Sequence, residues 1–545
     1  MTTVSDLCLM NGYKCNLVEW TNTQLKERNT LEDVLKPIIA SNNNQTQLMD
    51  VTSENAMDIR PKHHLEPQEI ERSLRMVIID GLCSEIVVCL SSGAILMGAA
   101  LLLGASNFQI GLLASFPTLC NLAQLLTIVL IQRYPNRKVI TVLSVFIAKL
   151  PLLLIGFVMW SNANLSFNIL LGFMFIHYFL SAVGGAGWNS WIKDLVPEQR
   201  LGSYFSKRTR VMQVTNIAVS LIVAALVDYY GNRAPETLSD LYGVYFFSAG
   251  LIGAAGAFFL VQACEPKQHM SGGNLGPLLL EPLKNPNFKN LLLFNAAWLL
   301  AINLAIPFFT VFMLKTLGLS MKVVILLTVV SQIASVAGLR LWGNLSDRYS
   351  NKSIIYLTAP IYISCILLWI FVGIYSRALP NLVLLVLLHI MTGVSTGGIN
   401  LALTNIGLKL APKTDAIIYI TVKNMVASFF TALGPIFGGL LVDYFSTREL
   451  QISISWKSPG LQSMAKLIYL HEWNFLFLLA SVLAFISLRL LAKVQENGEV
   501  SHQLVKRIMK KRFRAGLKET LLVGNIITLH AQLKQILKRK TTSSD

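Results

Sequence analysis

The chain has 545 residues, of which 53% are hydrophobic and only 14% are charged. Because about a quarter of the residues of an ordinary soluble domain are charged, this composition excludes a water-soluble globular protein. The formal net charge of +17 is then explained by the distribution of basic residues across a membrane. We do not attribute it to nucleic-acid binding.

Apolar segments long enough for a helix to cross about 30 Å of hydrocarbon, about 17–25 residues each, follow one another along the chain. They predict an all-α membrane protein with twelve transmembrane helices, whose boundaries are set to within several residues. The predicted helices are 82–103, 110–131, 139–160, 166–188, 211–229, 242–262, 291–313, 323–342, 353–375, 381–403, 417–441 and 474–491.

These helices divide the chain into five parts. Residues 1–66 are polar and rich in Asn, without the apolar core of a cleavable signal peptide, and we expect a mobile cytoplasmic extension. Residues 67–263 form an amphipathic lead-in helix, which begins at a proline, and a first six-helix bundle. A linker at 264–290 leads to a second bundle at 291–493. Residues 494–545 are a basic tail that can meet anionic lipid headgroups.

The basic residues of the loops predict the orientation of the helices. Loops and helix ends after even-numbered helices carry 17 Lys and Arg residues, and the opposite loops carry 7. Because Lys and Arg in short loops stay on the cytoplasmic side, both termini are expected in the cytoplasm.

An internal repeat connects the two sets of six helices. QRYPNRKVI at 132–140 aligns with DRYSNKSII at 347–355, and LVDYY at 226–230 aligns with LVDYF at 441–445, both at a spacing of 215 residues. A Leu-Gly-x-Ser segment ends helix 1 and recurs at the end of helix 7, one residue out of that register. An offset of six helices preserves direction in the membrane, so the repeat predicts two parallel bundles.

One loop carries a family resemblance. GNLSDRYSNK, which contains Gly343, Asp347, Arg348 and Lys352, resembles the cytoplasmic loop motif of the major facilitator superfamily. The first-half copy departs from the motif because Gln132 stands where the aspartate is expected. The resemblance covers roughly residues 76–493. It implies a monomeric secondary transporter, in a bacterial inner membrane, whose two bundles tilt about a central site for a small solute.

The Asp-Arg pair of this motif suggests a gating contact. A carboxylate can accept hydrogen bonds from the positive end of a facing helix. We therefore expect Asp347 to meet Arg208 or Arg210 at the start of helix 5, across the interface between the halves. The alternative is a turn that only fixes the topology.

The resemblance also implies that helices 1, 4, 7 and 10 surround the central cavity, and polar residues fall on these helices. Buried polar groups in lipid are costly and tend to face protein or water. The same small and hydroxyl residues also mediate helix packing, so packing stays open as the alternative. The cavity candidates are His177 and Ser181 on helix 4, Asn295 and Trp298 on helix 7, His389, Thr392, Thr396 and Asn400 on helix 10, and Asn216 on helix 5.

Three titratable residues are candidates for proton coupling. Glu85, His177 and His389 lie within predicted helices, and imidazole changes its charge near neutral pH. Two alternatives stay open. Glu85 can lie at the headgroup level and be solvated, and each histidine can be a hydrogen-bonded group of the protein core. Lys149 in helix 3 is expected to pair with a neighbouring helix or to extend toward the interface.

Other functions are disfavoured by what the sequence lacks. No phosphate-binding loop of the ATP-driven pumps is present, and the acids and histidines are too dispersed for an enzyme. The seven cysteines contain no Cys-x-x-Cys pair, and we expect no metal, cofactor or disulfide framework. GPIFGG in helix 11 predicts close packing and a kink. A non-transporting sensor on a transporter fold remains the alternative function, and substrate, direction and coupling ion stay open.

Overall fold

The computed structural model describes residues 61–63, 65–134, 136–161, 166–267, 275–348, 350–373, 378–412, 416–458 and 461–496. The expected N-terminal extension up to residue 60 and the basic tail after residue 496 lie outside these residues. In the described part, twelve helical segments are long and apolar enough to cross a membrane. The expected all-helical, twelve-span fold class is confirmed.

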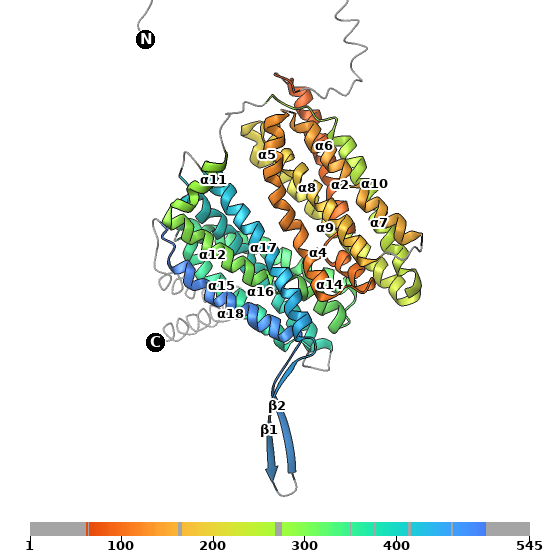
Figure 1. Cartoon of the computed structure of the whole chain (residues 1–545), viewed down its shortest axis with the longest axis vertical. Helices are drawn as coiled ribbons and strands as arrows, with labels where there is room; N and C mark the ends of the chain where they lie inside the picture. The colour runs from red at the N-terminus through yellow and green to blue at the C-terminus, as the bar shows by residue number, and fades with distance from the viewer. Residues whose placement is uncertain are drawn as a thin grey trace, which may run out of the picture. The chain divides into compact units, whose positions relative to one another are not determined.

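The first half of the chain supplies six spans (Figure 1). In chain order these are α2 (Pro67–Ser91) with α3 (Gly93–Leu102), α4 (Asn107–Leu119) with α5 (Gln124–Arg133), α6 (Arg137–Ile147) with α7 (Leu150–Trp160), α8 (Phe167–Leu195), α9 (Leu201–Arg233) and α10 (Leu238–Leu260). Pro67 is the first residue of α2, so the amphipathic lead-in and helix 1 are continuous.

The second half repeats the arrangement. After α11 (Leu275–Lys284) in the linker, its spans are α12 (Pro286–Asn303) with α13 (Ile306–Val311), α14 (Met321–Arg348), α15 (Asn351–Leu368), α16 (Ala378–Leu410), α17 (Ala416–Phe445) and α18 (Trp473–Ala492). The breaks within spans 1, 2, 3 and 7 were not predicted. Three of them lie next to Pro117, Pro151 and Pro307, and proline removes a backbone donor from a helix.

A β-hairpin interrupts the helical order. Strands β1 (Glu449–Ser458) and β2 (Leu461–His471) pair antiparallel with a bulge at Ile452/Ser453, and Figure 1 shows them projecting beyond the end of α17. Sequence analysis placed a simple loop here, although QISISWK alternates apolar and polar residues as strands do. We call this side of the helices the hairpin end, and the side where α5, α10 and α14 end the linker end.

A buried glutamate caps the third span of each half at the linker end. The carboxylate of Glu265 accepts from the backbone N–H groups of Arg137 (3.0 Å) and Lys138 (3.1 Å). The carboxylate of Glu496 accepts from those of Asn351 (3.2 Å) and Lys352 (2.8 Å). A helix start has N–H groups without intrahelical partners, so each half satisfies the same need in the same way. This contact gives the sequence repeat a structural counterpart.

Glu496 provides a test of this cap. Burial alone would raise the pKa of Glu496, but hydrogen bonds from Lys352, Asn351 and Lys409 outweigh burial and hold the pKa below its ordinary value of 4.5. A carboxyl group with a lowered folded-state pKa stabilises the fold fully above its unfolded-state pKa. That contribution is lost as the pH falls through the folded-state value.

We expect Glu496→Gln to lower the free energy of unfolding at neutral pH by about 1.5–3 kcal/mol, the value of a hydrogen bond to a charged group. In this variant the side-chain NH2 group of Gln would face the backbone N–H groups of Asn351 and Lys352, which are also donors. Thermal unfolding of the purified protein, measured from pH 7 to pH 4, should show the difference shrinking at low pH. Glu198→Gln changes an exposed carboxylate and serves as the control. An equal effect of both variants would contradict the capping role.

Candidate functional site

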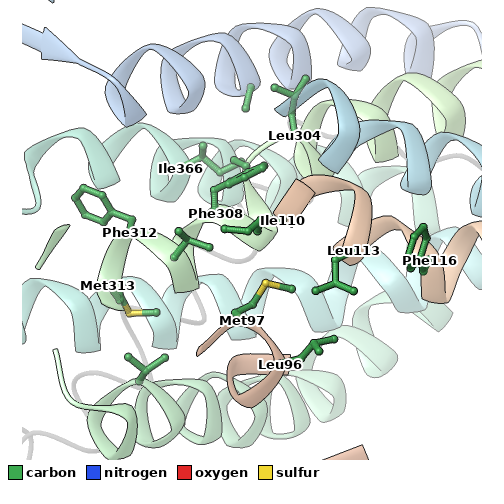
Figure 2. Close-up of a cluster of buried hydrophobic side chains, with 14 of the residues drawn as sticks. Leu96, Met97, Ile110, Leu113, Phe116, Leu304, Phe308, Phe312, Met313 and Ile366 are labelled. Atoms are coloured by element: carbon green, nitrogen blue, oxygen red, sulfur yellow. The ribbon is translucent and has the colours of Figure 1, made fainter. Parts of the chain in front are cut away.

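The two halves meet at the hairpin end in one buried apolar cluster. It includes Leu96 and Met97 of α3, Ile110 of α4, and Phe308 of α13, each at most 8% exposed. Figure 2 shows these side chains converging from both halves of the chain. These side chains fill the space between the halves with apolar groups toward the hairpin end.

Backbones of the two halves also approach each other closely at the hairpin end. A Cβ added to Gly111 of α4 would lie 2.1 Å from the carbonyl oxygen of Pro435 in α17, and one added to Gly439 would lie 2.4 Å from the carbonyl oxygen of Asn107. Only glycine fits at such distances. The close packing predicted for GPIFGG is confirmed.

A polar network lies inside the first half, on the linker side of this cluster. Nδ2 of Asn216 in α9 donates to Glu85 of α2 over 2.7 Å, and the Asn216 backbone carbonyl accepts from Sγ of Cys89 at 3.7 Å. Both side chains are only partly buried. The structure thus brings together two residues that were predicted for different roles, coupling and cavity lining.

Arg208 lies eight residues before Asn216 on α9, nearer the linker end. Its guanidinium lies over the ring of Trp188 in α8, 4.5 Å from the ring centre, and against the backbone of Gly81, where a Cβ would be 3.0 Å from Nη2. Nε of Arg208 and Nε1 of Trp188 are both buried without a hydrogen-bond partner among the described residues. Within the described part of the chain, two adjacent donors therefore lack acceptors in this state, which calls for an explanation.

Asp80 and Lys149 complete the network, and Asp80 was missed by the sequence analysis. The charges of Arg208 and Lys149 both act on Asp80, which is 5% exposed, while Lys149 is 7% exposed. The side chains of Lys149 and Asp80 pack against glycines of α10. A Cβ added to Gly253 would meet Lys149, and one added to Gly256 would meet Asp80. The available signal was a single aspartate within the apolar run RMVII-D-GLC. Lys149 was expected to pair with a neighbouring helix, and its packing against Gly253 of α10 is consistent with that expectation.

Each of the two histidines is hydrogen-bonded to a backbone carbonyl group of its own half. Nδ1 of His177 lies 2.7 Å from the carbonyl oxygen of Ala148, where α6 ends, and the buried ring therefore donates to a helix break in its own half. Nδ1 of His389 lies 2.8 Å from the carbonyl oxygen of Leu385, and its ring packs edge-on against Trp369. These contacts favour the alternative interpretation, in which both are satisfied groups within their own bundles.

The predicted helix 10 carries polar and small residues at three- and four-residue steps, and this polar stripe combines packing with exposure. Its members are His389, Thr392, Gly393, Thr396 and Asn400. A Cβ at Gly393 would lie 2.1 Å from the carbonyl oxygen of Ser331 in α14, so this face of α16 packs on α14. Oγ1 of Thr396 donates to the backbone carbonyl of Thr392 at 2.6 Å, and Asn400 is exposed. Cavity roles for Thr392, Thr396 and Asn400 stay predictions.

The remaining cavity candidates lie in the core of their bundles. Asn295 is 3% exposed, and Trp298 is fully buried beside Tyr362, with ring centres 6.1 Å apart. Oγ of Ser181 is buried without a hydrogen-bond partner among the described residues. The structure does not place these three residues with Glu85 and Arg208.

The loop motif is only partly described. Gly343 and Asp347 lie in the last turns of α14, but the side chains of Asp347 and Arg348 lie outside the described residues, so their contact with Arg208 or Arg210 stays a prediction. Lys352 is the second residue of α15 and gives its N–H to Glu496. Arg210 is exposed and donates to the Ser206 carbonyl at 3.4 Å. Within the described residues, no group of three or more His, Cys, Asp or Glu could hold a metal ion.

Comparisons with known proteins agree with this arrangement. The model of the Major Facilitator Superfamily matches residues 81–416 and also residues 291–529. The fold is similar to that of the nucleoside transporter NupG, at 14% identity and a TM-score of 0.60, over 78% of this chain and 100% of that one. No curated protein sequence matches the chain.

Two further solved structures share the fold. A bacterial homologue of the iron transporter ferroportin, in an inward-facing state, has 12% identity and a TM-score of 0.54, over 79% of this chain and 99% of that one. A POT family transporter in complex with 5-aminolevulinic acid has 11% identity and a TM-score of 0.53, over 81% of this chain and 100% of that one. At these identities the likeness shows the fold alone.

Gly393 tests whether the helix 10 stripe is a packing surface. Gly393→Ala would force a Cβ against the α14 backbone, and overpacking costs about 1–3 kcal/mol, so we expect a lower thermal unfolding midpoint. Gly172→Ala, on α8, adds a Cβ with nothing within 4 Å and is the matched control. If Gly393→Ala were as stable as the control, α16 and α14 could not pack as described.

Proposed function

The chain belongs to the major facilitator superfamily, a family of transporters and not of enzymes, and from this premise we propose that it is a secondary active transporter working by alternating access. In this cycle the two six-helix bundles expose a central site for a small solute first to one side of the membrane and then to the other. The observation that carries the proposal is the distribution of contacts between the halves. Among the described residues, apolar packing and cross-half hydrogen bonds gather at the hairpin end, while the polar network lies toward the linker end.

This distribution corresponds to a state closed at the hairpin end. The linker end would be cytoplasmic, because it carries most of the loop Lys and Arg residues. Both termini would then be in the cytoplasm, and a bacterial inner membrane is the location that we propose. A polar solute entering from the linker end would meet Glu85, Asn216 and Arg208 before it met the apolar cluster.

The chemistry of the network narrows the solute class. The unpartnered donors of Arg208 and Trp188 suit a solute with carbonyl, carboxylate or phosphate oxygens, and the Trp188 ring adds an aromatic surface. Asn216 and Glu85 supply an amide and a carboxylate for hydroxyl or amine groups. We propose a polar, acceptor-bearing solute, with nucleosides as the first probes because NupG is a nucleoside transporter.

Glu85 is the residue that we propose for proton coupling. Its carboxylate is partly exposed and accepts from the neutral amide of Asn216 at 2.7 Å. His177 and His389 are each engaged by a backbone carbonyl of their own half.

The binding site is tested by a thermal-shift screen of the purified protein against nucleosides, sugars, amino acids, siderophores and cationic drugs, since a ligand stabilises the state that it binds. We expect Trp188→Phe and Arg208→Lys each to weaken binding of the hit about tenfold. The first removes the indole N–H, and the second replaces the planar guanidinium, with its Nε–H, by a compact ammonium group. Arg200→Lys, at an arginine paired with Glu71, is the control. Unchanged affinity in both variants would place the site elsewhere.

The coupling role of Glu85 is tested in proteoliposomes with the same ligand. Glu85→Gln should keep exchange of labelled for unlabelled solute and lose accumulation driven by a pH gradient, because the amide cannot titrate. Accumulation equal to that of the unaltered protein would exclude Glu85 as the coupling group. Binding without any flux in the unaltered protein would favour the alternative function, a membrane sensor.

A further inference from the structure

Two aspartates at equivalent positions of the repeat connect the halves at the hairpin end. Asp228 lies in LVDYY near the end of α9, and Asp443 lies in LVDYF near the end of α17, 215 residues later. Each carboxylate reaches the first turn of a helix in the opposite half. Asp228 contacts α14 of the second half, and Asp443 contacts α4 of the first half.

The hydrogen bonds of Asp228 are directed at the exposed donors of α14. Oδ1 accepts from the backbone N–H of Met321 at 2.7 Å, and Oδ2 accepts from that of Lys322 at 2.8 Å. The next two donors are met locally, because Oγ and the carbonyl oxygen of Ser320 accept from Val323 and Val324. The aspartate of one half therefore completes the cap that the serine of the other half begins.

Asp443 makes a related contact with α4, through one backbone donor and one side-chain donor. Oδ2 accepts from the backbone N–H of Phe108 at 2.9 Å, and Oδ1 accepts from Nδ2 of Asn107 at 2.8 Å. Oγ and the carbonyl oxygen of Ser106 accept from the following two N–H groups, of Gln109 and Ile110. The two caps are thus made by matching residues in both halves.

The turns before these helices also match. Gly104 and Gly318 have φ angles of +73° and +61°, a left-handed conformation that favours glycine. Each glycine lies two residues before the capping serine and turns the chain sharply from one span into the next. The Leu-Gly-x-Ser repeat noticed in the sequence therefore presents the start of α4 and of α14 to the opposite half.

These contacts differ from the glutamate caps of the linker end in two ways. Glu265 and Glu496 cap helices of their own half and are 2% and 5% exposed, so the halves can move without breaking them. Asp228 and Asp443 are only partly buried and join opposite halves, so opening the hairpin end must break both. Water at that end can then take over the freed N–H groups, which makes the break reversible.

We infer that Asp228 and Asp443 form a paired latch that holds the hairpin end closed, in which each carboxylate caps the first turn of a helix in the other half. This inference rests on the proposed alternating-access function and names residues that position the halves within the cycle. The charge-assisted bonds and the favourable interaction of each carboxylate with a helix N-terminus stabilise the closed state. Both caps open and close together, because each half moves as one bundle.

Hydrogen–deuterium exchange of the protein in lipid nanodiscs tests the latch without any substrate. We expect Asp228→Asn to speed exchange about tenfold at the start of α14, where its own partners lie, and also at the start of α4, which it does not touch. Asp443→Asn should speed exchange at the same two places. Asp240→Asn, at a carboxylate in the first turn of α10 with a buried oxygen lacking a partner, is the control and should change neither.

Acceleration confined to the helix that the altered aspartate caps would show a local cap and overturn the paired latch. Unchanged exchange at both helices would overturn it as well. Because this result does not depend on flux, a failed latch is distinguishable from a failed transport assay.

A second pair of variants leaves both carboxylates in place. Lys322→Pro removes one N–H donor to Asp228, at a first-turn position where proline is tolerated, and Lys322→Ala removes the same exposed side chain but keeps the donor. We expect the proline variant alone to reproduce the exchange pattern of Asp228→Asn. Equal exchange in the proline and alanine variants would show that the backbone bond does not hold the halves together.

Discussion

The structure depends on one constraint, which is that the N–H groups at the start of a helix need acceptors where water is scarce. Four carboxylates of the described residues meet this need at the two ends of the bundles. Glu265 and Glu496 act within the halves at the linker end, and Asp228 and Asp443 act between the halves at the hairpin end. The first pair makes each half a stable body. The second pair makes the closure of the hairpin end depend on contacts that a moving half can release.

Close backbone packing supports the same division. Gly111 and Gly439 let α4 and α17 approach across the interface, while Gly393 lets α16 approach α14 inside the second half. Small residues therefore mark both fixed and movable interfaces, and the difference between them lies in the polar contacts at the helix ends. The polar network around Arg208 and Glu85 occupies the first half, so the solute site that we propose is asymmetric although the scaffold is repeated.

The twelve spans and the repeat of two bundles could be predicted from the sequence. The length of each hydrophobic segment and the constant spacing of the repeated motifs can be read directly from the chain. The site was predicted less well. Glycine and threonine on helix 10 give the same pattern whether they line a cavity or pack on a neighbour, and the structure shows that Gly393 packs. Asp80 was assigned to the lead-in helix because the predicted span began two residues later.

The caps could not be predicted for a different reason. Asp228 lies 93 residues from Met321, and Asp443 lies 335 residues from Phe108, so their pairing depends on the placement of whole bundles. The repeated LVDY segment gave a signal that the position mattered, although not what it contacts. The β-hairpin was missed because a short period-2 pattern was outweighed by the surrounding helical spans.

Distances between labels on the two halves test the central claim of alternating access most directly. One pair of labels at Trp160 and Leu379 would report on the hairpin end, and another at Gln132 and Leu408 would report on the linker end, with the protein in lipid. The account predicts two populations whose distances change in opposite directions at the two ends when solute or a proton gradient is supplied. A single unchanging distance at both ends under all these conditions would contradict it.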